Sequence, residues 1–368
     1  MLTPTQVVLL SGPDVRVIGG SARARNERVI ARAGAVSIEK PNFSAPGSLV
    51  VVPPDVLLAV TLFQQQLPEQ PTWLESEDGA AVLCGPAQAL SPLLSDPSLA
   101  ADLPRTAAPA GSLLAIGTYT ERQRALWSVL KQTGKPTDGW VARHFNRPIS
   151  RVFSFVLLSL GLRASHASAI TLLVGLFAAL IAARPGYIPL VIMGLLFQMA
   201  SVLDGVDGEM ARATLTESNE GARLDAIVDQ VTYVACFVGV TWGWAREGGG
   251  MQVLAWTGAI AVALVLSLLR GAQFVQRFAP DASFVFIDRT VRRAARESDL
   301  MPLRMAASGF TLLRRDLFAV VFFLVSLLGR RILIPALVVF GIVLANVTLT
   351  AYRREIEAAA LLERSAAL

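Results

Sequence analysis

The sequence predicts a soluble α/β domain followed by an α-helical integral membrane domain of six transmembrane helices. The 368 residues are 53% hydrophobic, and the mean hydropathy of +0.53 is high for a soluble protein. Most of the apolar residues follow residue 150, where five runs without Asp, Glu, Lys or Arg approach the roughly 20 residues that span a bilayer core. These runs cover 164–183, 185–203, 230–245, 248–269 and 332–352. A shorter run, 317–329, extended by its neighbours, supplies the sixth helix.

The first 130 residues are expected to form the soluble α/β domain. Short apolar segments at 7–10, 48–52, 80–84 and 113–117 have the length and composition of buried strands. Helical segments and Pro-rich connections separate them, an alternation that predicts a parallel sheet with helices on its faces. The N-terminus has no basic segment followed by a long apolar core, so no cleavable signal is expected and this domain should lie in the cytoplasm.

The segment after the first predicted strand bears on what the α/β domain does. A nucleotidyltransferase of this class would carry a Gly-rich, basic loop there, because backbone N–H groups and a cation hold the triphosphate. Residues 18–29 read IGGSARARNERV, which contains two glycines but no G-x-G-x-R-x-x-x-K pattern. The domain is therefore either a catalytic nucleotidyltransferase or a degenerate, structural or regulatory module.

Residues 131–163 are predicted to be a linker and an interfacial amphipathic helix. Arg143, Arg147 and Arg151 recur at a spacing of four, and Trp140 and Phe145 are suited to the acyl boundary. Six helices in 164–355 are then expected near 165–183, 187–212, 221–244, 251–275, 316–330 and 332–352, with a long basic loop between the fourth and fifth. A charged cytosolic tail, 356–368, closes the chain.

Positive charge predicts the orientation of these helices. Most arginines lie in the juxtamembrane segment, the second-to-third and fourth-to-fifth connections and the C-terminus, while the opposite connections hold only Arg184, Arg246, Arg330 and Arg331. The positive-inside rule then places both termini on the cytoplasmic side of a multi-pass inner or plasma membrane protein. The same rule accounts for the net charge of +5 and pI near 9.7 without a nucleic-acid partner.

Histidine and cysteine are too few for a metal site built on them. Cys84 and Cys236 are expected to be ordinary buried thiols, and only His144 and His166 are available as imidazoles. Aspartate is the residue type that clusters instead. Asp204 and Asp207 are three residues apart, and their pair ends the second predicted membrane helix. A second pair, four residues apart, begins the third helix at Asp225 and Asp229.

Each aspartate pair lies on one face of its helix, and a helix–turn–helix brings the two faces together at the cytoplasmic surface. Carboxylates with little His or Cys favour hard cations, so we expect Mg²⁺ or Mn²⁺ and, with four ligands, two ions. Two ions about 4 Å apart suit phosphoryl transfer. Small residues between the pairs let a phosphorylated ligand approach the backbone, and Arg212 supplies a cation one turn after Gly208.

This stretch resembles the motif of the CDP-alcohol phosphotransferases at all eight defined positions. It reads Asp204-x2-Asp207-Gly208-x2-Ala211-Arg212-x8-Gly221-x3-Asp225-x3-Asp229. The resemblance implies transfer of a phosphoalcohol from a CDP-alcohol donor to an acceptor hydroxyl, with release of CMP, by a homodimer. It also implies that the four aspartates are metal ligands and that Asp229 is the general base. By the same match, the nucleotide is bound by Gly208, Ala211, Arg212 and Gly221.

The α/β domain followed by KPTDGWVARHFNRPIS resembles a fusion in which an inositol-phosphate cytidylyltransferase precedes a CDP-inositol-using phosphotransferase. The donor is then CDP-inositol or another CDP-polar alcohol, and the acceptor an inositol phosphate or a lipid hydroxyl. A CDP-diacylglycerol donor with a polar acceptor is the alternative. Four arginines are candidates for binding an anionic acceptor, although contact with lipid headgroups or stabilisation of a loop is the favoured role for each one taken singly: Arg147, Arg163, Arg270 and Arg315.

Two other classes of membrane protein also carry intramembrane aspartates. Membrane prenyltransferases present Asp-rich motifs to Mg²⁺ and diphosphate, but their two motifs are expected on helices far apart in sequence. An ion-coupled transporter also places aspartates in helices, yet does not require Gly208, Ala211, Arg212 and Gly221 at these spacings. Both alternatives are weaker than the phosphotransferase.

Overall fold

The computed structural model describes residues 5–39, 41–44, 46–135, 138–278, 285–309 and 315–367. Contacts divide the chain into two compact units, and each is described by itself. The first comprises Met1–Pro136, Ile149–Ala167 and Gly205–Ala222, and the second comprises Thr137–Pro148, Ser168–Asp204 and Arg223–Leu368. The domain boundaries expected at 130, 163 and 355 stay predictions.

A six-stranded sheet forms the centre of the first unit, in the order β4-β1-β5-β8-β7-β9. Its strands are β1 (Gln6–Leu9), β4 (Val36–Ser37), β5 (Ser48–Val52), β7 (Thr72–Glu75), β8 (Ala81–Pro86) and β9 (Arg105–Ala107). Two further pairs are β2 (Arg16–Val17) with β3 (Gly20–Ser21), and β6 (Val56–Leu58) with β10 (Leu113–Ala115). The helices of this region are α1 (Ala22–Arg32), α2 (Ala87–Ser95) and α3 (Tyr119–Lys131), with 3₁₀ turns η1 (Val60–Gln64) and η2 (Pro97–Ala100).

The sheet is mixed, so the prediction of a parallel sheet is wrong in part. Strands β4, β1 and β5 are parallel, but β8 runs antiparallel to both β5 and β7. The antiparallel pairing of β7 with β8 has a local reason, because the two strands are joined by a tight turn at Asp78–Gly79, where Gly79 has φ +85°, and such a hairpin makes only antiparallel pairs. The predicted strand at 113–117 exists as β10 but pairs with β6 outside the main sheet.

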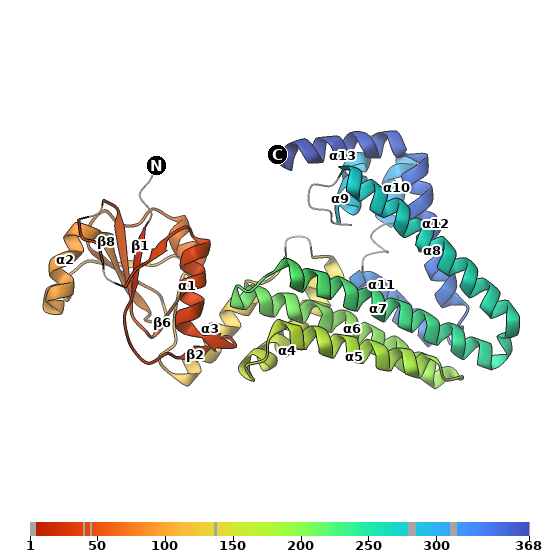
Figure 1. The fold of residues 1–368 in the computed structure, drawn as a ribbon, viewed down its shortest axis with the longest axis horizontal. Coiled ribbons are helices and arrows are strands. Elements are labelled where there is room, and N and C mark those ends of the chain that lie inside the picture. The colour runs from red at the N-terminus through yellow and green to blue at the C-terminus, as the bar shows by residue number, and fades with distance from the viewer. Residues whose placement is uncertain are drawn as a thin grey trace. The chain divides into compact units, whose positions relative to one another are not determined.

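Helices cover both faces of this sheet, as predicted. Val7, Val50 and Val52 point toward α1, whereas Val8 and Val51 point toward α2, in two separate hydrophobic clusters. Figure 1 shows α1 and α2 on opposite sides of the strands. This alternation is what the period of two along each strand requires of a sheet buried on both faces.

The rest of the described chain is helical (Figure 1). The π-helical turn η3 (Ala142–Asn146) leads into α4 (Arg147–Ser159), and the apolar helices are α5 (Ala164–Ala182), α6 (Tyr187–Thr214), α7 (Asn219–Trp244) and α8 (Gly250–Phe278). The π-helical turn η4 (Ala245–Gly249) joins the last two. After them come α9 (Val285–Glu297), α10 (Met301–Gly309), α11 (Arg315–Leu327), α12 (Leu333–Ala351) and α13 (Arg353–Ala367).

A helix lies at each of the six predicted membrane positions, but six membrane crossings are not confirmed. Four described stretches are long and apolar enough to cross a bilayer, namely Ala164–Ala182, Tyr187–Thr214, Asn219–Phe278 and Leu333–Ala351. The third covers both α7 and α8, which a non-helical Gly248 interrupts at φ +103°. Helix α11 has 13 residues, or about 20 Å, which is shorter than the ~30 Å hydrocarbon core.

The described residues of the predicted basic loop and of the predicted charged tail are largely helical, so the loop prediction is wrong. Helices α9, α10 and α13 share a hydrophobic cluster that includes Val291, Leu303 and Ile356. Arg293 of α9 lies 3.2 Å from Glu363 of α13. Apolar residues at helical spacing thus pack this segment into helices, although its many charged residues predicted a solvated loop.

Small residues allow the helices of the second unit to approach closely. A Cβ added at Gly239 of α7 would overlap the carbonyl oxygen of Ala179 on α5, and one at Gly194 of α6 would overlap the hydroxyl of Ser326 on α11. Such positions allow backbones to touch, a common device where helices pack within lipid. Cys236 packs in the same core, and both cysteines are buried free thiols as predicted.

Candidate active site

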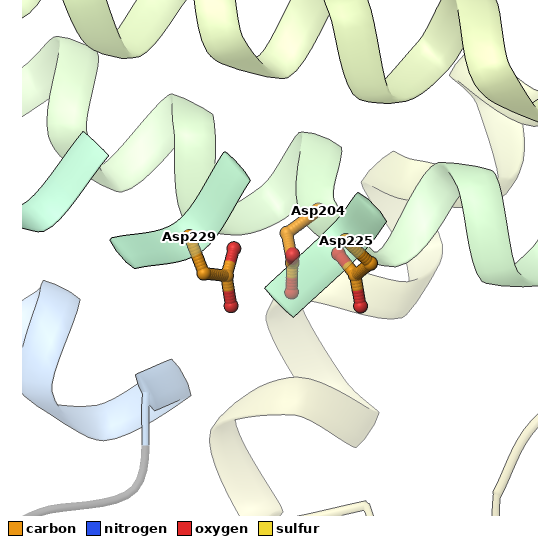
Figure 2. Close-up of side chains that lie close together, drawn as sticks. All are labelled: Asp204, Asp225 and Asp229. Atoms are coloured by element: carbon orange, nitrogen blue, oxygen red, sulfur yellow. The ribbon is translucent and has the colours of Figure 1, made fainter. Parts of the chain in front are cut away.

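The structure brings three of the four predicted metal ligands together. Asp204 lies on α6, and Asp225 and Asp229 lie one turn apart on the same face of α7. One carboxylate oxygen from each residue lies within 4.8 Å of the others. All three side chains are half-buried, and Figure 2 shows their carboxylates directed to the same side. The helix–turn–helix therefore brings these three aspartates together, as their spacing predicts.

The fourth predicted ligand, Asp207, lies one turn after Asp204 on α6 and belongs to the first compact unit. Its side chain is buried, and its Oδ1 accepts a hydrogen bond from the N–H of Gly208. It is not a member of the three-carboxylate group. Its role as a ligand stays a prediction.

The predicted nucleotide-binding residues follow on the same helix and on the first turn of α7. Arg212 donates from Nε to the carbonyl oxygen of Thr133 at 2.8 Å. A Cβ at Gly208 would lie 3.0 Å from Nη1 of Arg212, so glycine at this position leaves the guanidinium its space. Gly221 donates its N–H to Ser218 Oγ at 3.0 Å. Ala211 accepts from the Thr216 N–H at the end of α6.

Glu209, inside the same motif, is a residue that sequence reasoning missed. It is fully buried, and its two carboxylate oxygens each accept a hydroxyl hydrogen bond at 2.7 Å, from Ser150 and Ser154 of α4. The two serines are four residues apart and so lie on one face of α4. A buried carboxylate requires such donors, and this arrangement fixes α4 against the end of α6. The available signal was the pair of serines at a spacing of four on the amphipathic helix α4.

The four candidate acceptor-binding arginines have different surroundings. Both Nε and Nη2 of Arg147 donate to the carboxylate of Asp138, at 2.8 and 2.9 Å, so an anionic acceptor would compete with a buried ion pair. Arg270 is exposed on α8 and donates to Asn346 Oδ1 at 3.1 Å. Arg163 is exposed before α5, and the side chain of Arg315 lies outside the described part of the chain.

Residues 18–29, where a nucleotidyltransferase would carry its phosphate-binding loop, form a hairpin turn and most of α1. Residues 18–19 form the turn of the β2–β3 hairpin, with φ +53° at Ile18 and +71° at Gly19, and α1 follows directly. A Cβ at Gly19 would lie 2.9 Å from Cδ2 of Leu158 on α4. The turn therefore packs against α4, where a nucleotidyltransferase needs an open cradle.

Residues 164–289 match the model of the CDP-alcohol phosphatidyltransferase family. The chain carries a CDP-alcohol phosphatidyltransferase domain. The match runs from α5 into α9 and contains the whole aspartate motif, which confirms the resemblance predicted from those eight positions.

Proteins similar to this chain are found in archaea and bacteria. A bifunctional IPC transferase and DIPP synthase of Thermococcus kodakarensis is 36% identical over 116 residues, which are 31% of this chain and 26% of that protein. A protein of the same name from Archaeoglobus fulgidus is 38% identical over 93 residues, 25% of this chain and 18% of its own length. One from Rubrobacter xylanophilus is 37% identical over 143 residues, covering 39% and 31%. The matched segments span less than a third of each relative.

Proposed function

We propose that this protein transfers a phosphoalcohol group from a CDP-alcohol to an acceptor hydroxyl and releases CMP. The observation that carries the proposal is the group of Asp204, Asp225 and Asp229 on α6 and α7, inside the segment that matches the phosphatidyltransferase family. Asp-rich prenyltransferases and ion-coupled transporters, the two alternatives, are not supported by that match.

The donor set fits a hard divalent cation. Three carboxylates with oxygens within 4.8 Å offer the oxygen ligands that Mg²⁺ and Mn²⁺ prefer. We propose that Asp207 completes the set and that two ions bind. Bound there, the ions would neutralise the oxygens of the diphosphate.

The residues of the motif then have separate tasks. Arg212 and the open backbone at Gly208 hold the cytidine diphosphate, because a guanidinium pairs well with phosphate oxygens. Asp229 accepts the proton of the acceptor hydroxyl as its oxygen bonds to the β-phosphorus. The bond from that phosphorus to the bridging oxygen breaks, and CMP leaves with the bridging oxygen. Asp229→Asn should therefore abolish turnover in a folded protein, and a wild-type rate in this variant would refute the role of base.

For the substrates we propose a CDP-inositol-like donor. The relatives are named bifunctional IPC transferases and DIPP synthases, and the sequence resembles a fusion of a cytidylyltransferase with a CDP-inositol-using phosphotransferase. CDP-diacylglycerol with a polar acceptor is the alternative donor. The two differ in which side of the reaction carries the lipid, so product analysis separates them.

We also propose that the protein is a homodimer with both termini and the aspartates on the cytoplasmic side of the membrane. The arginine distribution supports this orientation. A membrane-impermeant thiol reagent on intact cells should label Arg184→Cys but not Ser298→Cys, and the reverse pattern would invert the topology. Multi-angle light scattering in detergent measures the oligomeric state, and a monomeric mass would exclude the dimer.

The experiment that tests the function is a mass-spectrometric screen of the purified protein. CDP-inositol and CDP-diacylglycerol are each incubated with Mg²⁺ and with polyol, inositol phosphate or lipid acceptors, and CMP and the new phosphodiester are quantified together. Equal amounts of both products support the transferase. Diphosphate release, or solute flux without CMP, would contradict it.

A further inference from the structure

Three arginines on one face of α1 contact the C-terminal end of α6. Arg25 donates from Nε to the carbonyl oxygen of Ala213 at 3.0 Å, and Arg28 donates from Nη1 to that of Thr214 at 2.9 Å. Arg32 Nη1 lies 2.8 Å from Glu217 Oε2, just beyond the helix. The last carbonyls of a helix lack partners within it and carry partial negative charge, so cations there are favourable.

Arg25 is the fixed centre of this set. It is 7% exposed, and its Nη1 also donates to the carbonyl oxygen of Leu58 on β6 at 2.8 Å. Burial, and to a smaller extent the charge of Arg28, lowers the pKa of Arg25 to about 10, so the guanidinium is charged at neutral pH. One side chain thus joins a strand of the α/β domain to the end of α6.

The way α6 ends is itself set by the α/β domain. Leu215 has φ +56°, a left-handed conformation that is unfavourable for a residue with a Cβ and is usually taken by glycine. The Thr216 N–H bonds to the Ala211 carbonyl oxygen at 2.9 Å and closes the helix around it. The Leu215 side chain packs against the hydrophobic core of the sheet. The packing of the Leu215 side chain in that core offsets the cost of its left-handed backbone.

We propose that the α/β domain is a positioning clamp for the transferase site. In this proposal Arg25, Arg28, Arg32 and Leu215 hold the turn between α6 and α7, which places the nucleotide-motif residue Arg212. The four are positioning residues. The hairpin turn at Gly19, packed against α4, fits this role because it serves contact within the protein. The catalytic part of the proposal rests on the function proposed above.

Kinetics test the clamp with variants on one helix. Arg28→Gln removes the guanidinium that donates to the Thr214 carbonyl oxygen. Because the Arg28 side chain is exposed, the substitution leaves the hydrophobic core intact. Arg23→Gln is the matched control, because Arg23 is an exposed arginine of α1 that pairs with Glu27 at 3.5 Å. We expect kcat/KM for the CDP-alcohol to fall about tenfold in Arg28→Gln, since small misplacements at a site cost up to ~100-fold. The KM should rise, Arg28→Lys should recover most of the loss, and Arg23→Gln should match the wild type. An unchanged KM in Arg28→Gln would overturn the claim that the clamp positions Arg212 for the CDP-alcohol.

Hydrogen exchange tests the clamp without turnover. In Arg28→Gln and in Leu215→Gly, which accepts the left-handed backbone but loses the anchoring side chain, residues 211–221 should exchange faster than in the wild type. Exchange in the sheet should be unchanged in Arg28→Gln. If the wild type releases no CMP, the proposed function fails while exchange still tests the clamp. Wild-type exchange at 211–221 in both variants would overturn it.

Discussion

Arg331 should be a major stabilising residue of the second unit. Its side chain is 2% exposed and lies 2.9 Å from Glu247 beside the α7–α8 turn. It donates to the carbonyl oxygen of Ala182, the last residue of α5, and to those of Arg184 and Gly186 in the connection that follows. The substitution Arg331→Leu keeps an apolar stem and leaves these acceptors without their donor. One guanidinium thus connects two separate turns.

Removing one partner of a buried ion pair costs about 3–5 kcal/mol. Glu247 is 32% exposed, so water replaces part of its interaction, and we expect the lower end, about 3 kcal/mol. The three carbonyls supply most of this, because a hydrogen bond to a charged group contributes about 1.5–3 kcal/mol and the bonds are not additive.

The assay is the fraction of protein that stays folded after heating in detergent, because such unfolding is usually irreversible and is measured as a rate. Arg330→Leu is the control, since Arg330 is adjacent and exposed. The folded fraction of Arg331→Leu should fall at a clearly lower temperature than that of the control. The Arg331 contact at Gly186 lies at the start of α6, far from the aspartates, because Tyr187 and Asp204 are 17 residues apart on that helix, or about 25 Å. The initial rate of CMP release per folded molecule should therefore be unchanged. Equal heat stability of the two variants would refute the reasoning.

Three further outcomes are expected. Ser154→Ala, which removes one donor from buried Glu209, should cost about 1–3 kcal/mol of stability, and a variant as stable as the wild type in thermal denaturation would contradict that role. Gly239→Ala should also cost about 1–3 kcal/mol of stability, because its Cβ would meet the backbone of Ala179. Gly258→Ala, with open space around its Cβ, should leave the stability unchanged. Equal melting temperatures of the two variants would disprove the close contact at Gly239. Burial raises the pKa of the Cys84 thiol to about 12, so below that pH it stays protonated and a maleimide at pH 8 should label it only after denaturation, as peptide mass spectrometry would show.

The apolar helices were predictable because charged residues interrupt the apolar runs near several of the helix ends. Arg163 and Arg184 flank α5, and Arg246 precedes α8, and the predicted ends of these two helices fell within a few residues of the observed bounds. The grouping of Asp204 with Asp225 and Asp229 followed from helical spacing and a short connection. Local periodicity is sufficient for such features.

The remaining features depend on contacts between distant segments. The antiparallel pairing of β7 with β8 follows from the Asp78–Gly79 turn, a signal present in the sequence but outweighed by the expected alternation of strands and helices. In the predicted basic loop, Ile287, Val291 and Ala294 have helical spacing that the arginines between them obscured. The left-handed Leu215 had no local signal, because its cause is the sheet core it packs against.

The central claim is that the carboxylates on α6 and α7 carry out the transfer, and one measurement tests it most directly. The initial rate of CMP release from the active CDP-alcohol is compared among the wild type, Asp225→Asn and Asp299→Asn, with Mg²⁺ and after chelation. Asp299 is the control because its side chain is fully exposed, beside Arg304. Release should need the ion, fall by at least ~100-fold in Asp225→Asn, and persist in Asp299→Asn. Release that survives both chelation and Asp225→Asn would contradict the claim.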